Sequence, residues 1–265
     1  MYRTILAASA ALVLGWAGQA AAQTGHVGLA YSRANLSQDS AGDANINVGT
    51  AEGAIVLPIE APVVLSLDGA LQNFDAEDGF STTSENGTAH ADFRLGGNAL
   101  VGGFLGFDHA EDFTLWGGGV EGQYTGQEGG VAAQLAYGQS DDLDNVDFWG
   151  ERVEGRFYGA DNLRFAAHLG AMQLSGDGGS TDLWNVGVDG EYQFSTAPIS
   201  VWAGYERSSW EDVDLTADVF SFGVRYNFGG SLRDRDAAGA NMGGFSNLFG
   251  GSLGGGLAGI LGDAL

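Results

Sequence analysis

From residue 24 to residue 228, apolar and polar residues alternate in successive short segments, and this period of two constrains the fold more than any other feature. The segment WNVGVDGEYQF (184–194) is typical, because Trp184, Val188 and Tyr192 share one parity. Asp189 and Glu191 share the other parity. Successive side chains of a β-strand point to opposite faces, so each such segment predicts a strand with one apolar and one polar face. With no convincing amphipathic helix before residue 240, the sequence predicts an all-β fold.

Charges on the polar faces indicate which way the strands are turned. Asp68, Arg94, Glu154 and Arg156 all lie opposite apolar stripes. A soluble sandwich or lipocalin-like barrel fills its interior with the apolar face, and it gains nothing from aromatic residues facing water. An apolar outside and a charged inside make sense only in lipid, where closure of the sheet pairs every backbone group. The pattern therefore predicts a transmembrane antiparallel β-barrel.

The connections between segments alternate between two kinds. Five are short turns, such as that at Ala160–Asn162, and six are more acidic and usually longer, such as Ser140–Asp147. Tight turns at one end and longer loops at the other are typical of outer-membrane barrels. Eleven connections require about twelve strands, each of roughly 9–11 residues if it just crosses a membrane. Ten or fourteen strands stay open because the glycine-rich residues 97–122 are hard to phase.

The N-terminus has the pattern of an export signal. Arg3 precedes an apolar run from Ile5 to about Trp16, and Ala20-Ala21-Ala22 supplies an A-x-A cleavage pattern. We therefore expect residues 1–22 to be a signal peptide, residues 23–229 to be the barrel and residues 230–265 to be a glycine-rich tail. The chain has no cysteine, which excludes disulfides and thiolate metal sites. After the signal, no apolar run is long enough to predict a transmembrane helix.

The net charge of −24 comes from 34 acidic residues against 10 basic ones, all of them arginine. Nucleic-acid binding needs cationic side chains for the phosphates, so we expect no nucleic-acid partner. Strong negative charge favours solubility and attraction of cations instead. Much of it falls in predicted loops, such as DAEDG (75–79) and EDVD (211–214), where solvated charge is the default interpretation. DAEDG lacks the spacing of an EF-hand, and we predict no metal site.

The last strand resembles the sorting signal of Gram-negative outer-membrane β-barrels. Its elements are Ser221, Gly223, Tyr226 and Phe228, in the register of that signal. Together with the export signal and the alternating strands, they make the chain similar to the small porin-like superfamily. The resemblance implies an outer-membrane location, insertion by the barrel assembly machinery, and contact with lipid and lipopolysaccharide. It names no particular substrate, and it leaves homo-oligomerisation open.

The chain departs from this pattern by continuing beyond Phe228. Apolar residues from Phe245 to Leu265 follow a helical spacing, but seven glycines between residues 250 and 262 make such a helix weak on its own. Three placements of the tail stay open. It is a disordered periplasmic extension, an amphipathic helix on the inner leaflet, or a segment that folds back and narrows the lumen.

The parity of the strands also predicts which charged residues face the lumen. Arginines that flank one short turn, such as Arg156 and Arg164, should be neighbours near the periplasmic end. Such charges either line an aqueous pore or pair with one another and close it. The predicted pore-lining residues are Asp68, Asp92, Arg94, Glu121, Arg152, Glu154, Arg156, Arg164, Asp189, Glu191, Glu206 and Arg225.

An enzyme is the class of function that the sequence supports least. None of the histidines His26, His90, His109 and His168 lies in a serine-hydrolase motif or has zinc-ligand spacing. We predict no catalytic residue and no cofactor. The sequence instead favours passive diffusion of small hydrophilic solutes or ions with a preference for cations. The alternative is a non-conducting structural or surface barrel that acts through its acidic loops and tail.

Overall fold

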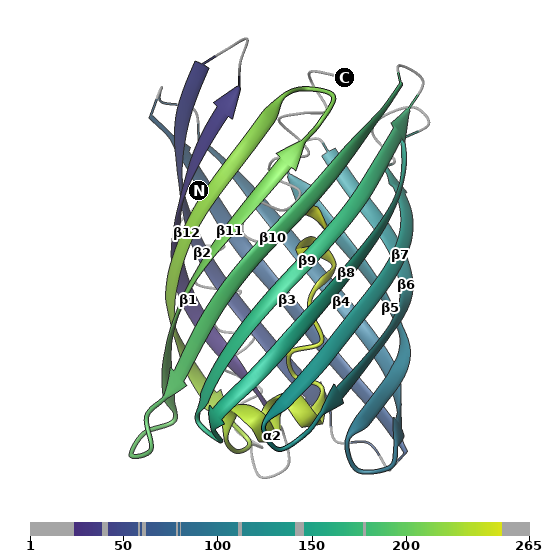
Figure 1. Cartoon of the computed structure of the whole chain (residues 1–265), viewed down its shortest axis with the longest axis vertical. Helices are drawn as coiled ribbons and strands as arrows, with labels where there is room; N and C mark the ends of the chain where they lie inside the picture. The colour runs from purple at the N-terminus through teal and green to yellow at the C-terminus, as the bar shows by residue number, and fades with distance from the viewer. Residues whose placement is uncertain are drawn as a thin grey trace, which may run out of the picture.

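The computed structural model describes residues 24–250, except 39–41, 58, 60, 61, 78, 80, 111, 112, 141–145, 177 and 178. The predicted signal peptide and the last part of the predicted tail lie outside these residues. Twelve strands form the wall (Figure 1): β1 (Thr24–Gln38), β2 (Gly42–Leu57), β3 (Val63–Ala76), β4 (Ser81–Leu95), β5 (Ala99–Ala110), β6 (Phe113–Thr125), β7 (Gly129–Ser140), β8 (Asp147–Ala160), β9 (Leu163–Gly176), β10 (Gly179–Gln193), β11 (Ile199–Trp210) and β12 (Leu215–Phe228).

The strands form a closed antiparallel barrel, as predicted. Each strand pairs with its neighbours in the sequence, and β1 closes the ring by pairing with β12 from Gly25 opposite Phe228 to Gln38 opposite Leu215. Closure leaves no unpaired sheet edge, which a bilayer would not tolerate. An even strand number brings the start of β1 and the end of β12 to the same end of the barrel, here called the turn end (Figure 1). The opposite end is called the loop end.

The strands are longer than the sequence predicted, with 12 to 16 residues each. The segment DAEDG (75–79), predicted to lie in a loop, belongs in part to β3, which continues to Ala76, and β4 begins at Ser81. The outward positions of β1 explain the difference, since they change from Leu29 and Tyr31 to Arg33 and Asn35 towards the loop end. Backbone pairing therefore continues past the apolar belt, and the strands extend beyond the lipid into water.

The two faces of the wall are inverted relative to a soluble barrel. Outward apolar side chains are exposed, for example Leu29 at 69% and Leu105 at 72%, while the inward neighbours His90 and Asp92 are buried. This arrangement confirms the predicted apolar outside and polar inside. Outward aromatic residues contribute to the belt: Trp116, Tyr124, Phe157, Tyr192, Phe194 and Tyr226.

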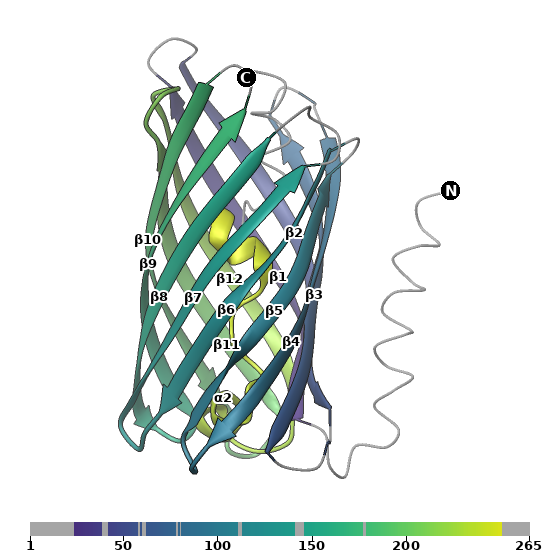
Figure 2. The ribbon, with the colours of Figure 1, turned by 90° about the vertical axis from the view of Figure 1, so that its right-hand side faces the viewer.

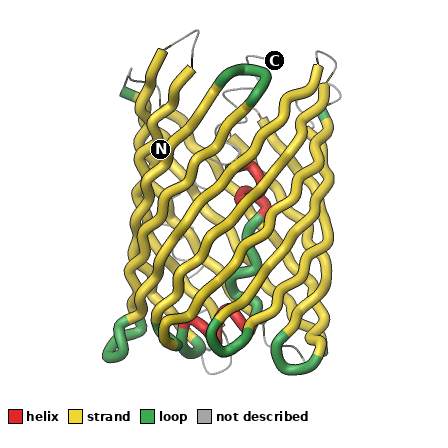
Figure 3. The backbone as a smooth tube through the Cα atoms, in the orientation of Figure 1, coloured by secondary structure: helices red, strands yellow, loops and turns green. Residues whose placement is uncertain are grey.

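The interior has two parts along the barrel axis. Towards the turn end the inward side chains are mostly polar or charged. Towards the loop end, Phe74, Phe148, Leu183 and Trp210 point inward and belong to one buried apolar cluster. The sequence analysis did not predict this inner apolar core. Residues 231–250 cross both parts, as Figure 2 shows from the side and Figure 3 shows by element type.

Candidate functional site: the barrel lumen and the segment inside it

Residues 231–250, here called the lumen segment, fold back into the barrel after β12. Gly229 and Gly230 make the reversal with positive φ angles of 85° and 115°, which only glycine adopts readily. The short helix α2 (Leu232–Ala238) follows, and the 3-10 helix η2 (Phe245–Phe249) lies further up the lumen. Of the three placements that the sequence left open for the tail, the described residues occupy the one inside the barrel.

Local sequence accounts for the start and end of α2. Ser231 is its N-cap and accepts a hydrogen bond from the Asp234 backbone N–H, while the Asp234 carboxylate accepts one from the Ser231 N–H. This reciprocal pair is a capping box, which satisfies backbone donors at a helix start. Gly239 ends the helix in the left-handed conformation, with φ of 102°. The chain then continues in irregular form to η2.

Asp236 on α2 forms the main charged contact between the lumen segment and the wall. Its side chain is fully buried. Arg164 Nη1 donates to both of its oxygens at 3.2 and 3.3 Å, and the Tyr158 hydroxyl donates to Oδ2 at 2.7 Å. Burial acts to raise the pKa of Asp236, but the charges of Arg164 and Arg156 outweigh it and lower the pKa below its usual value. The carboxylate is therefore held ionised inside the barrel.

Backbone carbonyls of the lumen segment also accept hydrogen bonds from the wall. Arg94 Nη1 donates to the Ala237 carbonyl at 2.9 Å, and Gln134 Nε2 donates to the Gly243 carbonyl at 2.7 Å. Arg156 donates to the Asn241 carbonyl. Carbonyls at a helix C-terminus and in irregular chain have no partner of their own, and leaving them buried and unpaired is costly. The polar wall thus supplies the partners that this chain segment lacks.

The upper part of the lumen segment packs into the inner apolar core. Phe245, Leu248 and Phe249 are buried there. The Phe148 ring lies edge-on to both phenylalanines, with centroids 5.7 Å from Phe245 and 4.9 Å from Phe249. Gly106 on β5 is required at this point, because a Cβ there would lie 2.4 Å from the Phe245 Cβ. Apolar contact therefore fixes the segment at the loop end as charge fixes it at the turn end.

The charges predicted to line a pore lie on the inward face, and most of them are paired. Their role in conduction stays a prediction. Within the described residues these pairings form a few groups on the inner wall: Asp68–His90–Glu121, Arg152–Glu154–Arg156, Arg164 with Asp189 and Glu191, Glu191 with Arg225, and His168–Glu206. Arg94 bonds to the lumen segment, while the buried Asp92 oxygens have no hydrogen-bond partner among the described residues.

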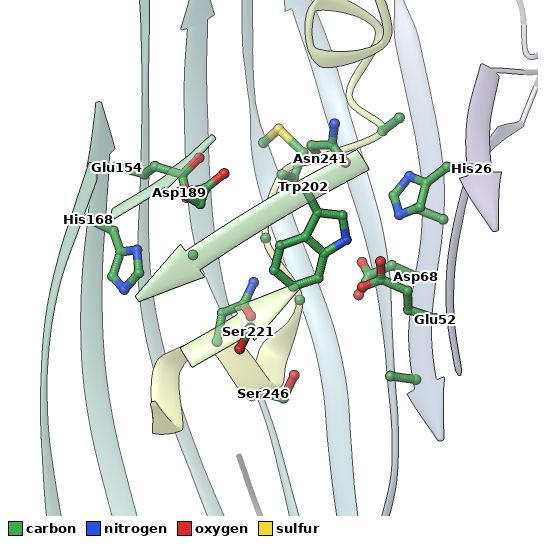
Figure 4. Close-up of a pocket in the computed structure, with 18 of the residues that line it drawn as sticks. His26, Glu52, Asp68, Glu154, His168, Asp189, Trp202, Ser221, Asn241 and Ser246 are labelled. Carbon is green, nitrogen blue, oxygen red and sulfur yellow. The ribbon is translucent and has the colours of Figure 1, made fainter. Parts of the chain in front are cut away.

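A polar cavity of about 270 Å³ remains beside the lumen segment. Figure 4 shows Trp202 of β11 at its centre, with Glu52 and Asp68 on one side and Glu154 and Asp189 on the other. Asn241 and Ser246 of the lumen segment complete the lining. Strands far apart in sequence thus contribute to one polar space beside the lumen segment.

Several residues of this site were not predicted from the sequence. Glu52 lies on β2, and its carboxylate accepts a hydrogen bond from Arg225 Nε at 2.7 Å. Its inward parity was a usable signal, as was the parity of Trp202. Arg235 and Asp236 carried no such signal, because nothing in the tail sequence shows that it enters the lumen.

The described residues contain no helix long and apolar enough to span a bilayer. They also contain no cluster of three histidine or acidic side chains arranged to hold a metal ion.

Comparison with known proteins places the fold. No family model matches the sequence, and no curated protein matches it. An outer-membrane channel from Pseudomonas putida F1 is 13% identical, with a TM-score of 0.58 over 77% of this chain and 96% of that one. The translocator domain of the autotransporter NalP from Neisseria meningitidis is 11% identical, with a TM-score of 0.54 over 83% of this chain and 93% of that one.

The monoaromatic hydrocarbon channel CymD is also 11% identical, with a TM-score of 0.55 over 77% of this chain and 88% of that one. At sequence identities this low, the comparisons support similarity of the fold alone. The closed ring of twelve strands, the apolar outer face and these neighbours agree with one another. The chain therefore has the fold of a small, porin-like outer-membrane β-barrel.

Proposed function

We propose that this protein is an outer-membrane channel for passive diffusion of small hydrophilic solutes and ions, and that the lumen segment holds it closed in the described state. The observation that carries this proposal is the charged inner wall beside a polar cavity. A barrel that served only as a scaffold would gain nothing from so many buried charges, since each is costly unless paired. Two of the similar structures are described as channels, which supports the same function. We assign the protein no catalytic role.

A preference for cations follows from the charge around the loop end. Glu211, Asp212 and Asp214 are exposed in the connection between β11 and β12. Asp43 and Asp147 are exposed near the same end. Acidic side chains around a channel mouth raise the local concentration of cations and repel anions. We therefore expect cations to enter more readily than anions once the lumen segment has moved.

The lumen segment is bound firmly enough to keep such a channel mostly closed. Burying a large apolar side chain contributes about 1.5–3 kcal/mol, and Phe245, Leu248 and Phe249 are all buried. Even the lower end of that range makes the open state a small minority. Conduction by the full chain should consequently be rare or brief, and weakening these contacts should increase it.

Bilayer recording of the refolded mature protein under a salt gradient tests the proposal. Phe245→Asp with Leu248→Asp should release the lumen segment and produce frequent conductance steps with a cation-selective reversal potential. Asn247→Asp is the matched control, because it adds a charge to the same 3-10 helix outside the apolar core. If the double variant folds and is as silent as the unmodified protein, the channel proposal is wrong.

That silent outcome would favour the second candidate, a non-conducting barrel that acts through its acidic loops and tail. The specific observation in its favour is that the lumen segment contacts the wall at both ends of the lumen.

For either function we propose the same assembly. The apolar outer belt contacts outer-membrane lipid, lipopolysaccharide lies around the acidic loop end, and Ser221, Gly223, Tyr226 and Phe228 direct insertion by the barrel assembly machinery.

A further inference from the structure

We propose that the polar cavity beside the lumen segment binds a small uncharged polyhydroxylated solute, of the monosaccharide or polyol class. The inference rests on the proposed channel function, since it names the class of solute that this lumen accepts. It stands on four observations. Among the described residues, they are two buried nitrogens without hydrogen-bond partners, two carboxylates that each have an oxygen without one, a balance of charge and the size of the cavity.

The two nitrogens are on β1 and β11. His26 is 5% exposed, and its Nδ1 has no hydrogen-bond partner among the described residues. The indole N–H of Trp202 also has none there, and Figure 4 shows this nitrogen on the side of the cavity that holds His26 and Asp68. Buried polar groups without partners are uncommon in native proteins. Both nitrogens belong to residues that line one cavity, which places them beside any ligand bound there.

The acceptors lie next to these nitrogens. Glu52 uses Oε1 to accept from Arg225 Nε at 2.7 Å, and Asp68 uses Oδ2 for its contact with His90 Nε2 at 2.6 Å. No other hydrogen bond is formed by either carboxylate within the described part of the chain. Each therefore has an oxygen that can accept from a ligand. A hydroxyl group donates and accepts at once, so adjacent hydroxyls suit this mixture of donors and acceptors.

The charges around the cavity favour an uncharged ligand. Five carboxylates and four arginines line it. Every one of these carboxylates already contacts an arginine or a histidine: Glu52–Arg225, Asp68–His90, Glu154–Arg156, Asp189–Arg164 and Glu206–His168. A bare cation would meet the arginines and an anion would meet the carboxylates, so neither gains from entering. The acidic loops select cations at the mouth, but they do not act on an uncharged solute.

The volume of the cavity also limits the size of the ligand. Its volume of about 270 Å³ is slightly below the range of roughly 300–1,000 Å³ that is typical of sites for drug-sized ligands. A single sugar ring or a short polyol suits such a space, whereas an oligosaccharide does not. The lining also includes Gly53, Gly69 and Gly204. Of these, Gly204 shares the inward parity of Trp202 and Glu206, so its lack of a side chain leaves space between these longer polar groups.

Ligand-observed saturation-transfer NMR on the full mature chain in detergent micelles tests the proposal. The probes are glucose, glucosamine and gluconate, which share a carbon skeleton but are neutral, cationic and anionic. We expect saturable binding of glucose, with the two charged analogues binding several-fold more weakly. Binding is measured with the lumen segment in place, so no channel opening is needed.

Two variants and a control assign the binding to this cavity. Trp202→Phe keeps an aromatic ring but removes the indole N–H, and Glu52→Gln removes a carboxylate oxygen. Each should weaken glucose binding about two- to tenfold, the worth of one hydrogen bond. Trp116→Phe is the control, because Trp116 lies on the outer face and should leave binding unchanged. Heat-modifiable migration in gels checks that each variant is folded, and either variant suffices if the other fails to fold.

Three outcomes would overturn the inference. Absence of saturation by all three probes would show that the cavity holds only water, and tighter binding of a charged analogue would show the wrong ligand class. Unchanged binding in folded Trp202→Phe and Glu52→Gln would place the site elsewhere. The result is separable from the channel test. A silent barrel that binds glucose rejects the channel alone, and a conducting barrel that does not bind it rejects this inference alone.

Discussion

At the scale of single residues, Asp236 decides how the turn end of the lumen is closed. It lies two residues before the end of α2, where it contacts Arg164 and Tyr158 from the wall and Asn241 from its own segment. A buried carboxylate is costly by itself, so its stability depends on these partners. The contacts with Arg164 and Tyr158 would be absent if the segment left the lumen. Asp236 therefore couples the position of the lumen segment to the charge inside the barrel.

Asp236→Asn should weaken docking of the lumen segment by about 1–3 kcal/mol, because the amide has the same shape but no charge for Arg164. Hydrogen exchange of residues 231–250 in the folded barrel measures this as faster exchange. Asp161→Asn is the control, since it removes only the exposed ion pair with Arg233 and should change little. Equal exchange in the Asp236 variant and the unmodified protein would contradict this role.

Lowering the pH should weaken docking of the lumen segment, as Asp236→Asn should. The pKa of Asp236 is lower in the docked segment than in a solvent-exposed one, whose ordinary value is about 3.9. Its stabilisation is therefore complete above about pH 5 and is lost as pH falls through the docked pKa. Exchange of residues 231–250 should rise in that acidic range. Asp236→Asn should lack this part of the pH dependence, and an identical profile in both proteins would argue against the assignment.

At the scale of elements, the strands show where the lipid ends. Outward positions of β1 are apolar at Leu29 and Tyr31 but polar at Arg33 and Asn35, although the pairing with β2 and β12 continues without interruption. On β12 the outward residues likewise change from Phe222 and Phe220 to Asp218. The apolar belt is therefore shorter than the strands, and the wall continues beyond it at the loop end.

Leu29→Arg should destabilise the barrel in lipid vesicles by about 2–4 kcal/mol, because it places a charge on the lipid face within the belt. Asn35→Arg on the same face of the same strand should cost about 0–1 kcal/mol, since this position lies past the belt. Urea unfolding monitored by tryptophan fluorescence gives both free energies. Equal costs would mean that the belt extends to Asn35.

At the scale of the whole molecule, twelve strands enclose a space that side chains of the wall only partly fill. The lumen segment fills much of the remainder, with charge at the turn end and apolar contact at the loop end. The two ends of the lumen segment can therefore be tested separately by mutation. Changes at Asp236 act on one end of the segment, and the Phe245 and Leu248 substitutions that test the channel act on the other.

Much of the wall could be predicted from single residues and their spacing. Parity alone placed Asp68, Arg94 and Glu191 inside, and it placed Val188 and Tyr192 outside. The sorting motif that ends at Phe228 indicated the last strand, and β12 ends there. Strand ends were harder to predict, because polar outward residues such as Asp75 resemble a loop when the neighbouring strands are not seen.

The sequence by itself determined that the chain is a closed, inverted barrel, because alternation at a period of two fixes the two faces and only lipid accepts that arrangement. It did not determine what fills the lumen. Phe74, Phe148 and Trp210 occupy inward positions, and only the folded chain shows that Phe245 and Phe249 pack among them. The pairing of Asp236 with Arg164 likewise joins residues 72 positions apart. Such contacts depend on distances across the barrel, which no local pattern in the sequence encodes.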